Sequence, residues 1–362
     1  MIEKVMKAVK SSNKRRGRNI TIGAVIGFLL SCTAVMGAND NYLWIKEDSG
    51  AIEFINQETT SSDGSDGTWS EENPYKDAGN IWDKDTATKT YTYTNNIKLS
   101  SNGVNGKYEG EYGYGYDMSY GLRLSGDLTN VNFVNNSSIM GIMSGGSSSA
   151  PSSGIYNEST KMGNIENTGV ISGEGSSSGS YEGVGYGIYN KSGTIGDITN
   201  TGTISGKGSS SSNSAEGYGI YNDSNNDSND EEIGNITNIK NIGIISGEGS
   251  SSGSNGSVSG YGIYNKSGTI EDITNIGVIS GSATSTPSGF ESYASGKGYG
   301  INNEKQMGAI TNKGVISGSG AASDKGYGYG YGIYNDSNDK KIGSITNIGI
   351  ISGYGSNSDT YH

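Results

Sequence analysis

Aliphatic residues recur along most of this chain at fixed distances from glycine, tyrosine and asparagine. In one unit, residues 187–190 read Gly-Ile-Tyr-Asn, residues 198–200 read Ile-Thr-Asn, and residues 204–206 read Ile-Ser-Gly. Units with the same order start at residues 121, 154, 219, 262, 300 and 332, and the first of these is degenerate. A single repeat of roughly 20 to 50 residues cannot bury its apolar face alone, whereas stacked repeats can. The pattern therefore predicts a solenoid.

Each unit contains three short segments with the residue types of β-strands. Glycine and asparagine, which tolerate turn conformations, separate the segments. No helical period of apolar residues follows residue 37. Insertions fall at one or two corners of the repeat, at residues 225–232 in one unit and around Pro287 in another. We therefore predict an all-β fold, a parallel β-helix (a β-solenoid) of about seven coils over residues 121–362.

Equivalent positions in successive units predict which side chains face the core. One column is aliphatic throughout and is the predicted core ladder: Leu122, Ile155, Ile188, Ile220, Ile263, Ile301 and Ile333. A second column consists of Ile171, Ile204, Ile245, Ile279, Ile316 and Ile351. A third consists of Ile165, Ile198, Ile236, Ile273, Ile310 and Ile345. Three aliphatic columns suit a three-sided tube.

The column that follows the core ladder is mostly tyrosine. It contains Arg123, Tyr156, Tyr189, Tyr221, Tyr264, Asn302 and Tyr334. Because it accepts Arg and Asn, and because strand neighbours alternate in direction, we expect it to face outward. Its tyrosines are then either a candidate adhesion face or a cross-coil stack that stabilises the rod. A second tyrosine file is expected on the isoleucine side, partly buried: Tyr120, Tyr186, Tyr218, Tyr261, Tyr299 and Tyr331.

Asparagine also recurs at two positions of the repeat. One series is Asn157, Asn190, Asn222, Asn265, Asn303 and Asn335. Another is Asn167, Asn200, Asn275, Asn312 and Asn347. Such residues serve either as turn formers or as an Asn ladder, in which stacked amides donate and accept along the stack.

Residues 1–37 have the order of a secretory signal peptide. Seven Lys and Arg residues precede an apolar run over residues 20–35, and small residues then lead to a predicted cleavage site between Gly37 and Ala38. The run is shorter than the ~20 residues of a spanning helix, so cleavage is favoured over a membrane anchor. Cys32, the only cysteine, lies within this segment, where a lipoprotein-type box ending at Cys32 is an alternative. The cleaved chain would have no disulfide.

Residues 38–120 are irregular and hold all three tryptophans, Trp44, Trp69 and Trp82. The alternating Thr and Tyr of residues 90–94 predict a strand. Because the end coil of a solenoid exposes its apolar core, we expect this region to be an N-terminal cap. The predicted domains are thus the signal peptide, 1–37, the cap, 38–120, and the β-helix, 121–362.

The charge of the chain excludes one class of partner. The net charge is −12, and removing residues 1–37, with seven positive and one negative charge, makes it −18. A surface this acidic repels phosphate backbones, so we expect no nucleic-acid binding.

Residues suited to catalysis or metal binding are scarce. The sole histidine is His362, so no histidine triad or histidine metal site is expected. One acidic position varies between coils: Asp197, Glu166, Asn235, Asp272, Ala309 and Ser344. Residues 223–232 alternate oxygen-bearing side chains but lack the glycine and the spaced glutamate of a calcium loop. We therefore predict no enzyme, no cofactor and no metal site.

The basic N-terminus, residues 1–19, together with the apolar run to Gly37, resembles the N-terminal segment of fusobacterial autotransporter proteins. The Ile-Thr-Asn-x-Gly-x-Ile-Ser-Gly coils resemble their β-helical passenger domains. The resemblance implies a right-handed helix and type V secretion, with export through the Sec translocon and display through an outer-membrane barrel. No barrel pattern is present in this sequence. The chain is then either the front of a longer autotransporter or a truncated or separately secreted passenger.

We therefore expect an exported protein located at the cell surface, in the outer membrane or outside the cell. It would act as an adhesin or interaction scaffold, through multivalent contacts with a protein or glycan on a host cell or neighbouring bacterium. The alternatives are a structural spacer, a glycan-active β-helix enzyme and a trimeric autotransporter with a left-handed roll.

Overall fold

The computed structural model describes residues 41–48, 51–58, 67–69, 81–85, 90–109, 115–145, 150–223, 234–253, 256–287, 294–323, 326–336 and 341–358. The predicted signal peptide, with Gly37, Ala38 and Cys32, lies outside these residues, as does His362. The described residues belong to one compact unit, residues 38–362, and form strands without any helix. This part of the chain accordingly contains no helix that is long and apolar enough to cross a bilayer.

From residue 115 onward the strands come in threes, one set per coil. The first strands are β8 (Gly115–Leu128), β11 (Ala150–Met162), β14 (Gly183–Asn190), β17 (Ala215–Asn222), β20 (Ser257–Asn265), β23 (Ser295–Asn303) and β26 (Tyr327–Asn335). The second are β9 (Val131–Asn135), β12 (Ile165–Asn167), β15 (Thr194–Asn200), β18 (Asn235–Asn241), β21 (Thr269–Asn275), β24 (Gln306–Asn312) and β27 (Ile342–Asn347). The third are β10 (Ser138–Gly145), β13 (Val170–Ser177), β16 (Thr203–Ser210), β19 (Ile244–Ser251), β22 (Val278–Ser285), β25 (Val315–Ser323) and β28 (Ile350–Ser358).

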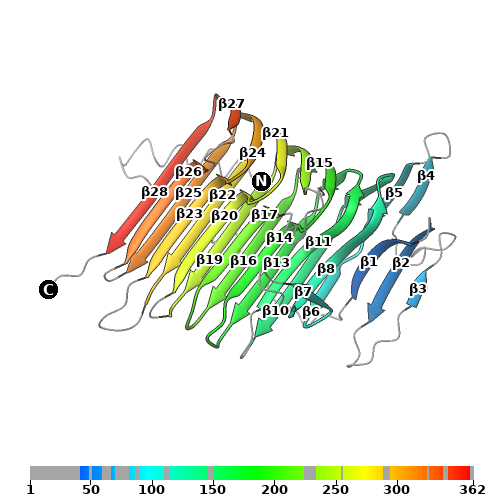
Figure 1. Ribbon diagram of the computed structural model, residues 1–362, viewed down its shortest axis with the longest axis horizontal. Coiled ribbons are helices and arrows are strands. Elements are labelled where there is room, and N and C mark those ends of the chain that lie inside the picture. The colour runs from blue at the N-terminus through cyan, green and yellow to red at the C-terminus, as the bar shows by residue number, and fades with distance from the viewer. Residues whose placement is uncertain are drawn as a thin grey trace. The chain divides into compact units, whose positions relative to one another are not determined.

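Each strand of a coil pairs in parallel with its equivalent in the next coil. Figure 1 shows the coils stacked in sequence order, with β8, β11, β14 and β17 following one another along the stack. The register matches repeat to repeat, with Ile188 opposite Ile220 in the first strands and Ile204 opposite Ile245 in the third. The predicted fold class, a parallel β-solenoid, is confirmed.

Strands from the region predicted as a cap also join the stack. β1 (Asn41–Asp48), β5 (Thr90–Asn95) and β6 (Leu99–Asn102) pair in parallel with β8, β9 and β10. The antiparallel pairs of the described chain are confined to this end, where β2 (Ala51–Glu58), β3 (Gly67–Trp69), β4 (Ile81–Asp85) and β7 (Gly106–Glu109) take part. Antiparallel partners on the terminal strands occupy edges that would otherwise be open.

Trp44 of β1 connects the layer formed by β1, β5 and β6 to the first coil. Its Nε1 donates to Ser125 Oγ at 2.7 Å, and the Arg123 guanidinium lies 4.4 Å from the centre of its ring. Arg123 also forms an ion pair with Glu158 of the following coil. Arg123, which occupies a position of the tyrosine column, thus connects three successive layers of the stack. Its planar guanidinium contacts Trp44 of β1, and its charge pairs with Glu158 of the following coil.

Four apolar columns, not three, line the interior. The core ladder from Leu122 to Ile301 is fully buried, and Ile333 of the last described coil is partly buried. The third predicted column was wrong at one position, because Ile239 and not Ile236 pairs with Ile198. Its members are Tyr93, Phe133, Ile165, Ile198, Ile239, Ile273, Ile310 and Ile345. Ile236 belongs to the fourth: Leu128, Met162, Ile195, Ile236, Ile270, Met307 and Ile342.

Glycine replaces apolar side chains where the first and third strands of the coils face each other. A Cβ at Gly206 would overlap the carbonyl oxygens of Tyr218 and Gly185, which are backbone atoms. The equivalent glycines meet the same obstacle: Gly173, Gly247, Gly281 and Gly318. In this glycine zone the two sheets therefore approach backbone to backbone. The high glycine content, 61 of 362 residues, is in large part a packing requirement of the solenoid.

Both asparagine series form hydrogen-bonded chains along the stack. Asn157, Asn190, Asn222, Asn265, Asn303 and Asn335 are linked amide to amide, each Nδ2 donating to the next Oδ1 at 2.7–2.8 Å. The second chain has more members than predicted: Asn95, Asn135, Asn167, Asn200, Asn241, Asn275, Asn312 and Asn347. Apart from the last residue of each, the members are fully buried. Between neighbouring members the amide nitrogen of one residue and the amide oxygen of the next are paired, so the ladders satisfy buried polar groups at the turns.

The three corners of the coil differ in how much their length varies. The corner between second and third strands, here the Asn-x-Gly corner, always has two residues. The corner between first and second strands ranges from two to twelve residues, the longest being 223–234. The serine corner, which joins a third strand to the next coil, ranges from three to nine, the longest being 286–294.

Candidate functional site

The predicted adhesion face is not exposed. Tyr156, Tyr189, Tyr221 and Tyr264 are 2%, 0%, 5% and 9% exposed, and only Tyr334 of the last described coil is partly accessible. The second tyrosine file, expected on the isoleucine side, instead joins the first in one cluster separate from the isoleucine core. Both predictions were therefore wrong about the surroundings of these rings.

Glycine at the bend between the two files explains why they meet. Gly187 faces the core, where a Cβ would lie 2.7 Å from Ile204 Cγ2, so Tyr186 and Tyr189 on either side of it fall together. Their ring centres are 4.7 Å apart. The next two coils repeat this spacing at Tyr218–Tyr221 and Tyr261–Tyr264. Each of these rings thus contacts one tyrosine ring of its own coil and lies between tyrosine rings of the two adjacent coils. The alternation of side chains along a strand does not predict that these neighbouring rings bury it.

Ring contacts continue from coil to coil. We use the name tyrosine stack for Tyr42, Tyr120, Tyr156, Tyr186, Tyr189, Tyr218, Tyr221, Tyr261, Tyr264, Tyr299, Tyr331 and Tyr334. Along one file the ring centres lie 4.8–5.1 Å apart, from Tyr186 to Tyr331. Along the other they lie 5.1–5.4 Å apart, from Tyr156 to Tyr264. The alternative reading of these residues, a cross-coil stack, agrees with this arrangement.

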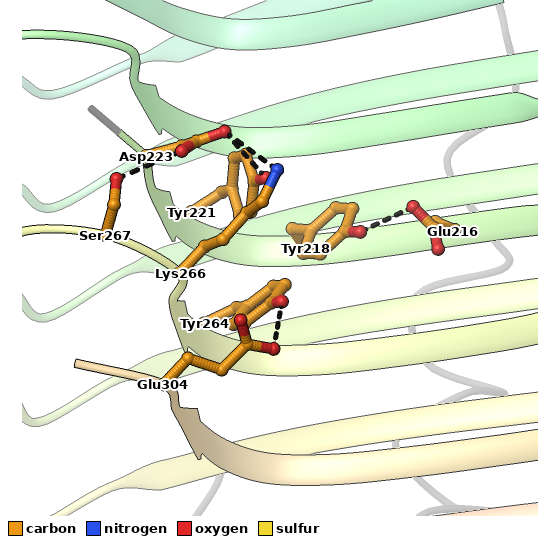
Figure 2. A network of polar contacts seen from close by, with 8 residues as sticks. All are labelled: Glu216, Tyr218, Tyr221, Asp223, Tyr264, Lys266, Ser267 and Glu304. Atoms are coloured by element: carbon orange, nitrogen blue, oxygen red, sulfur yellow. Dashed lines mark hydrogen bonds and ion pairs between the residues drawn. The ribbon is translucent and has the colours of Figure 1, made fainter. Parts of the chain in front are cut away.

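Three hydroxyl groups of the stack donate to carboxylates (Figure 2). Tyr218 Oη donates to Glu216 Oε2 at 2.5 Å, two residues earlier on β17. Tyr264 Oη donates to Glu304 Oε1 at 2.5 Å, in the next coil. These are charge-assisted hydrogen bonds of the stronger kind.

The third pair belongs to a larger group at the end of β17. Tyr221 Oη donates to Asp223 Oδ2 at 2.9 Å, and Asp223 is 1% exposed. Lys266 Nζ lies 3.4 Å from the same oxygen, and Ser267 Oγ donates to Oδ1 at 3.0 Å (Figure 2). A buried carboxylate with a cation and two hydroxyl donors is well compensated. Asp223, the first residue of the acidic segment 223–232 that lacks the features of a calcium loop, thus makes this contact, and residues 224–233 lie outside the described chain.

Burial raises the pKa of the phenols in the stack. It raises the pKa of Tyr299 to about 12, with the neighbouring Tyr331 adding to the effect. Burial likewise raises the pKa of Tyr218, Tyr261 and Tyr264, since a phenolate there would be poorly solvated beside carboxylates. Burial also raises the pKa of the Glu216 carboxyl, against the lowering effect of the Tyr218 hydrogen bond. The phenols therefore stay protonated at neutral pH.

A hydroxyl-lined hollow lies along the serine corner. It crosses four coils and is lined by Ser177, Ser209, Ser210, Ser211, Ser250, Ser251, Ser252, Thr284 and Thr286. The outer members, such as Ser211, Ser252 and Thr286, are exposed, whereas Ser210 and Ser251 accept hydrogen bonds from nearby backbone amides. Serine and threonine side chains of successive coils thus line one hollow along this corner.

The Asn-x-Gly corner presents a different surface, which was not predicted. Its outward position is Asn136, Thr168 and Thr201 in earlier coils, then Ile242 and Ile276, and finally Lys313 and Ile348. Ile242, Ile276 and Ile348 are 44%, 46% and 76% exposed. The earlier coils thus carry polar groups at this corner, whereas three of the last four described coils carry an exposed isoleucine and the other a lysine. The sequence itself contains this change of residue type, at the position between Asn and Gly in each corner.

Clusters suited to metal binding are absent from the described residues, in which no three His, Cys, Asp or Glu side chains converge. Asp197 does have a neighbour from the next coil, because Asn238 Nδ2 donates to its Oδ1 at 2.8 Å. This contact stabilises the outer surface and brings no second carboxylate to Asp197.

Comparison of the chain with known proteins gave no match among protein-family models, curated proteins or solved structures.

Proposed function

We propose that this chain is an exported solenoid passenger of the autotransporter type, which binds a surface protein or glycan through the loops of two corners. The observation that carries the proposal is the difference between corners: one always has two residues, whereas the others reach twelve and nine. A corner needed only for stacking keeps its length, whereas a solvent-facing loop is free to vary and to carry contacts.

Two further observations indicate that the corner loops, rather than the flat faces of the solenoid, form the binding surface. The tyrosine stack is buried and offers no aromatic face over most of its length. The serine corner, in contrast, joins successive loops along one hollow, and the exposed serine and threonine hydroxyls that line it can donate to and accept from a glycan. Repeated loops on a stiff rod also favour multivalent contact. Export itself rests on the signal-like residues 1–37 and their resemblance to autotransporters.

Loop grafting within the chain tests the proposal. In the test variant, residues 286–294 are replaced by the sequence of 211–214, and residues 224–233 by a single serine, so that the second corner has the three-residue length of 191–193 and Asp223 is kept. The purified full chain and the variant are then compared for binding to a glycan array and to cultured epithelial cells. We expect the unmodified chain to bind at least one of these probes and the graft to lose most of that binding.

The matched control changes the surface without touching the loops. Ile242→Ser with Ile276→Ser alters two exposed side chains at the constant corner, and its binding is expected to equal that of the unmodified chain. Binding that survives loop grafting but is lost in the control would place the contact at the constant Asn-x-Gly corner and contradict the proposal. A chain that binds neither probe would favour the structural spacer.

A further inference from the structure

One row of hydroxyl groups in the serine corner makes no hydrogen bond to the rest of the described chain. Ser209, Ser250 and Thr284 lie opposite one another in β16, β19 and β22, which belong to three consecutive coils. All three line the hollow at this corner, and their side chains are half-buried or exposed. No side-chain hydrogen bond within the described residues uses these hydroxyls. They form a row of available donors and acceptors that repeats once per coil, about every 4.8 Å.

A second row in the same hollow presents oxygen lone pairs. Ser211, Ser252 and Thr286 are exposed. Each of their hydroxyls donates to a backbone carbonyl of the preceding coil, at 3.2, 3.4 and 3.4 Å. Because the proton is already used, each of these oxygens faces solvent mainly as an acceptor. A ligand group that both donates and accepts, such as a sugar hydroxyl, suits the two rows together.

The hollow suits an uncharged ligand. Its lining residues are serine and threonine only, and the net charge of −12 disfavours an anionic ligand. Ser177 lines one end of the hollow and is 5% exposed, and its Oγ finds no partner among the described residues. A buried hydroxyl without a partner is unusual in a folded protein and indicates that a polar group from outside the chain completes the site.

We propose that the hollow binds one straight, neutral, β-1,4-linked glycan chain that lies across the coils, along the direction of the stack. The pyranose units of such a chain follow one another at nearly the spacing of parallel strands, about 4.8 Å, so successive sugars meet successive coils in the same way. The hollow crosses four coils and thus has room for about four sugar units. The inference rests on the proposed binding function, for which it names the ligand class and the contact residues.

A triple substitution in the first row tests the site. Ser209→Ala, Ser250→Ala and Thr284→Val remove three hydroxyls and leave the rest of each side chain nearly unchanged. Isothermal titration calorimetry measures the binding of cellohexaose, chitohexaose and mannohexaose, three straight β-1,4-linked probes, to the purified full chain. We expect the unmodified chain to bind at least one probe, and the triple variant to bind it about tenfold more weakly or worse.

Folding is measured separately, by urea unfolding. Because the three hydroxyls make no hydrogen bond within the described chain, the unfolding midpoint of the triple variant should equal that of the unmodified chain. If the triple variant does not fold, Ser250→Ala alone, at the centre of the row, should weaken binding about threefold.

The matched control removes the same number of hydroxyls from the same three strands. Ser205→Ala, Ser246→Ala and Ser280→Ala lie four residues earlier in β16, β19 and β22, and none of these residues lines the hollow. The affinity of this control for the straight probes should equal that of the unmodified chain. Maltohexaose, whose α-1,4 linkages curve the chain, should bind the unmodified protein about tenfold more weakly than the best straight probe.

Three results would overturn the glycan site. They are an unmodified chain that binds none of the three straight probes, a triple variant with the affinity of the control, and equal affinity for maltohexaose and the best straight probe. The loop graft keeps Ser209, Ser250 and Thr284 and is scored by binding to epithelial cells. A chain that binds these cells through its loops but binds no straight probe would contradict the glycan site alone. A graft that keeps its binding to cells would contradict the loop proposal instead.

Discussion

Gly206→Ala is expected to destabilise the folded chain by more than about 4 kcal/mol, in the range reserved for severe steric or burial defects. The added Cβ would overlap the carbonyl oxygens of Tyr218 and Gly185, which belong to strands in the middle of the stack. Backbone atoms held in two parallel ladders cannot move aside as a flexible side chain can. Urea unfolding followed by circular dichroism measures the effect.

Gly343→Ala provides the matched control. Its Cβ would meet the backbone of Gly308 at 3.3 Å, so a shift of a few tenths of an ångström accommodates it. A much smaller loss of stability is expected there. Equal effects of the two substitutions would contradict the backbone-to-backbone packing of the glycine zone.

Asn200→Ala should lower the free energy of unfolding by about 3 kcal/mol, because several buried polar groups lose their partners together. The Asn200 amide donates to Asn241 Oδ1 and to the Ile244 carbonyl, each at 2.9 Å. It also accepts from Asn167 Nδ2 at 2.8 Å. The alanine restores none of these bonds and leaves a cavity at a fully buried position.

Thr201→Ala, one residue later, serves as the control for the ladder. Thr201 is exposed, and its hydroxyl makes only a 3.3 Å hydrogen bond to the Asn167 carbonyl, so its loss should cost about 0.5 kcal/mol or less. Urea unfolding of both variants checks the difference. An Asn200→Ala midpoint as close to that of the parent as the Thr201→Ala midpoint would show that the ladder adds nothing to stability.

The fold could be predicted because the apolar columns repeat in a strict order. One ambiguity arose where residues 236–241 read Ile-Thr-Asn-Ile-Lys-Asn, so that two Ile-x-Asn segments follow each other. The second is the true equivalent, since Asn241 is followed by the glycine of the Asn-x-Gly corner. Choosing the first misplaced Ile236 and omitted Asn241 from the ladder. A corner of constant length is thus a better guide to register than the aliphatic residue alone.

The surroundings of the tyrosines could not be predicted in the same way. Alternation gives the direction of a side chain relative to its neighbours, but Gly187 bends the strand and brings Tyr186 and Tyr189 together. Their burial depends on rings from other coils, which no single repeat specifies. The partners of Tyr264 and Asp223 were hidden for the same reason, because Glu304 and Lys266 occur in the next coil.

A glycine- and serine-rich chain here forms a registered stack of coils whose strands are joined by loops at the corners. Hydrogen–deuterium exchange of the full chain, resolved by peptide mass spectrometry, tests this arrangement most directly. We predict slow exchange along the strands from β12 to β25 and fast exchange at residues 179–182 of the serine corner, which are largely exposed. Uniformly fast exchange over residues 165–323, as in a disordered chain of this composition, would contradict this arrangement.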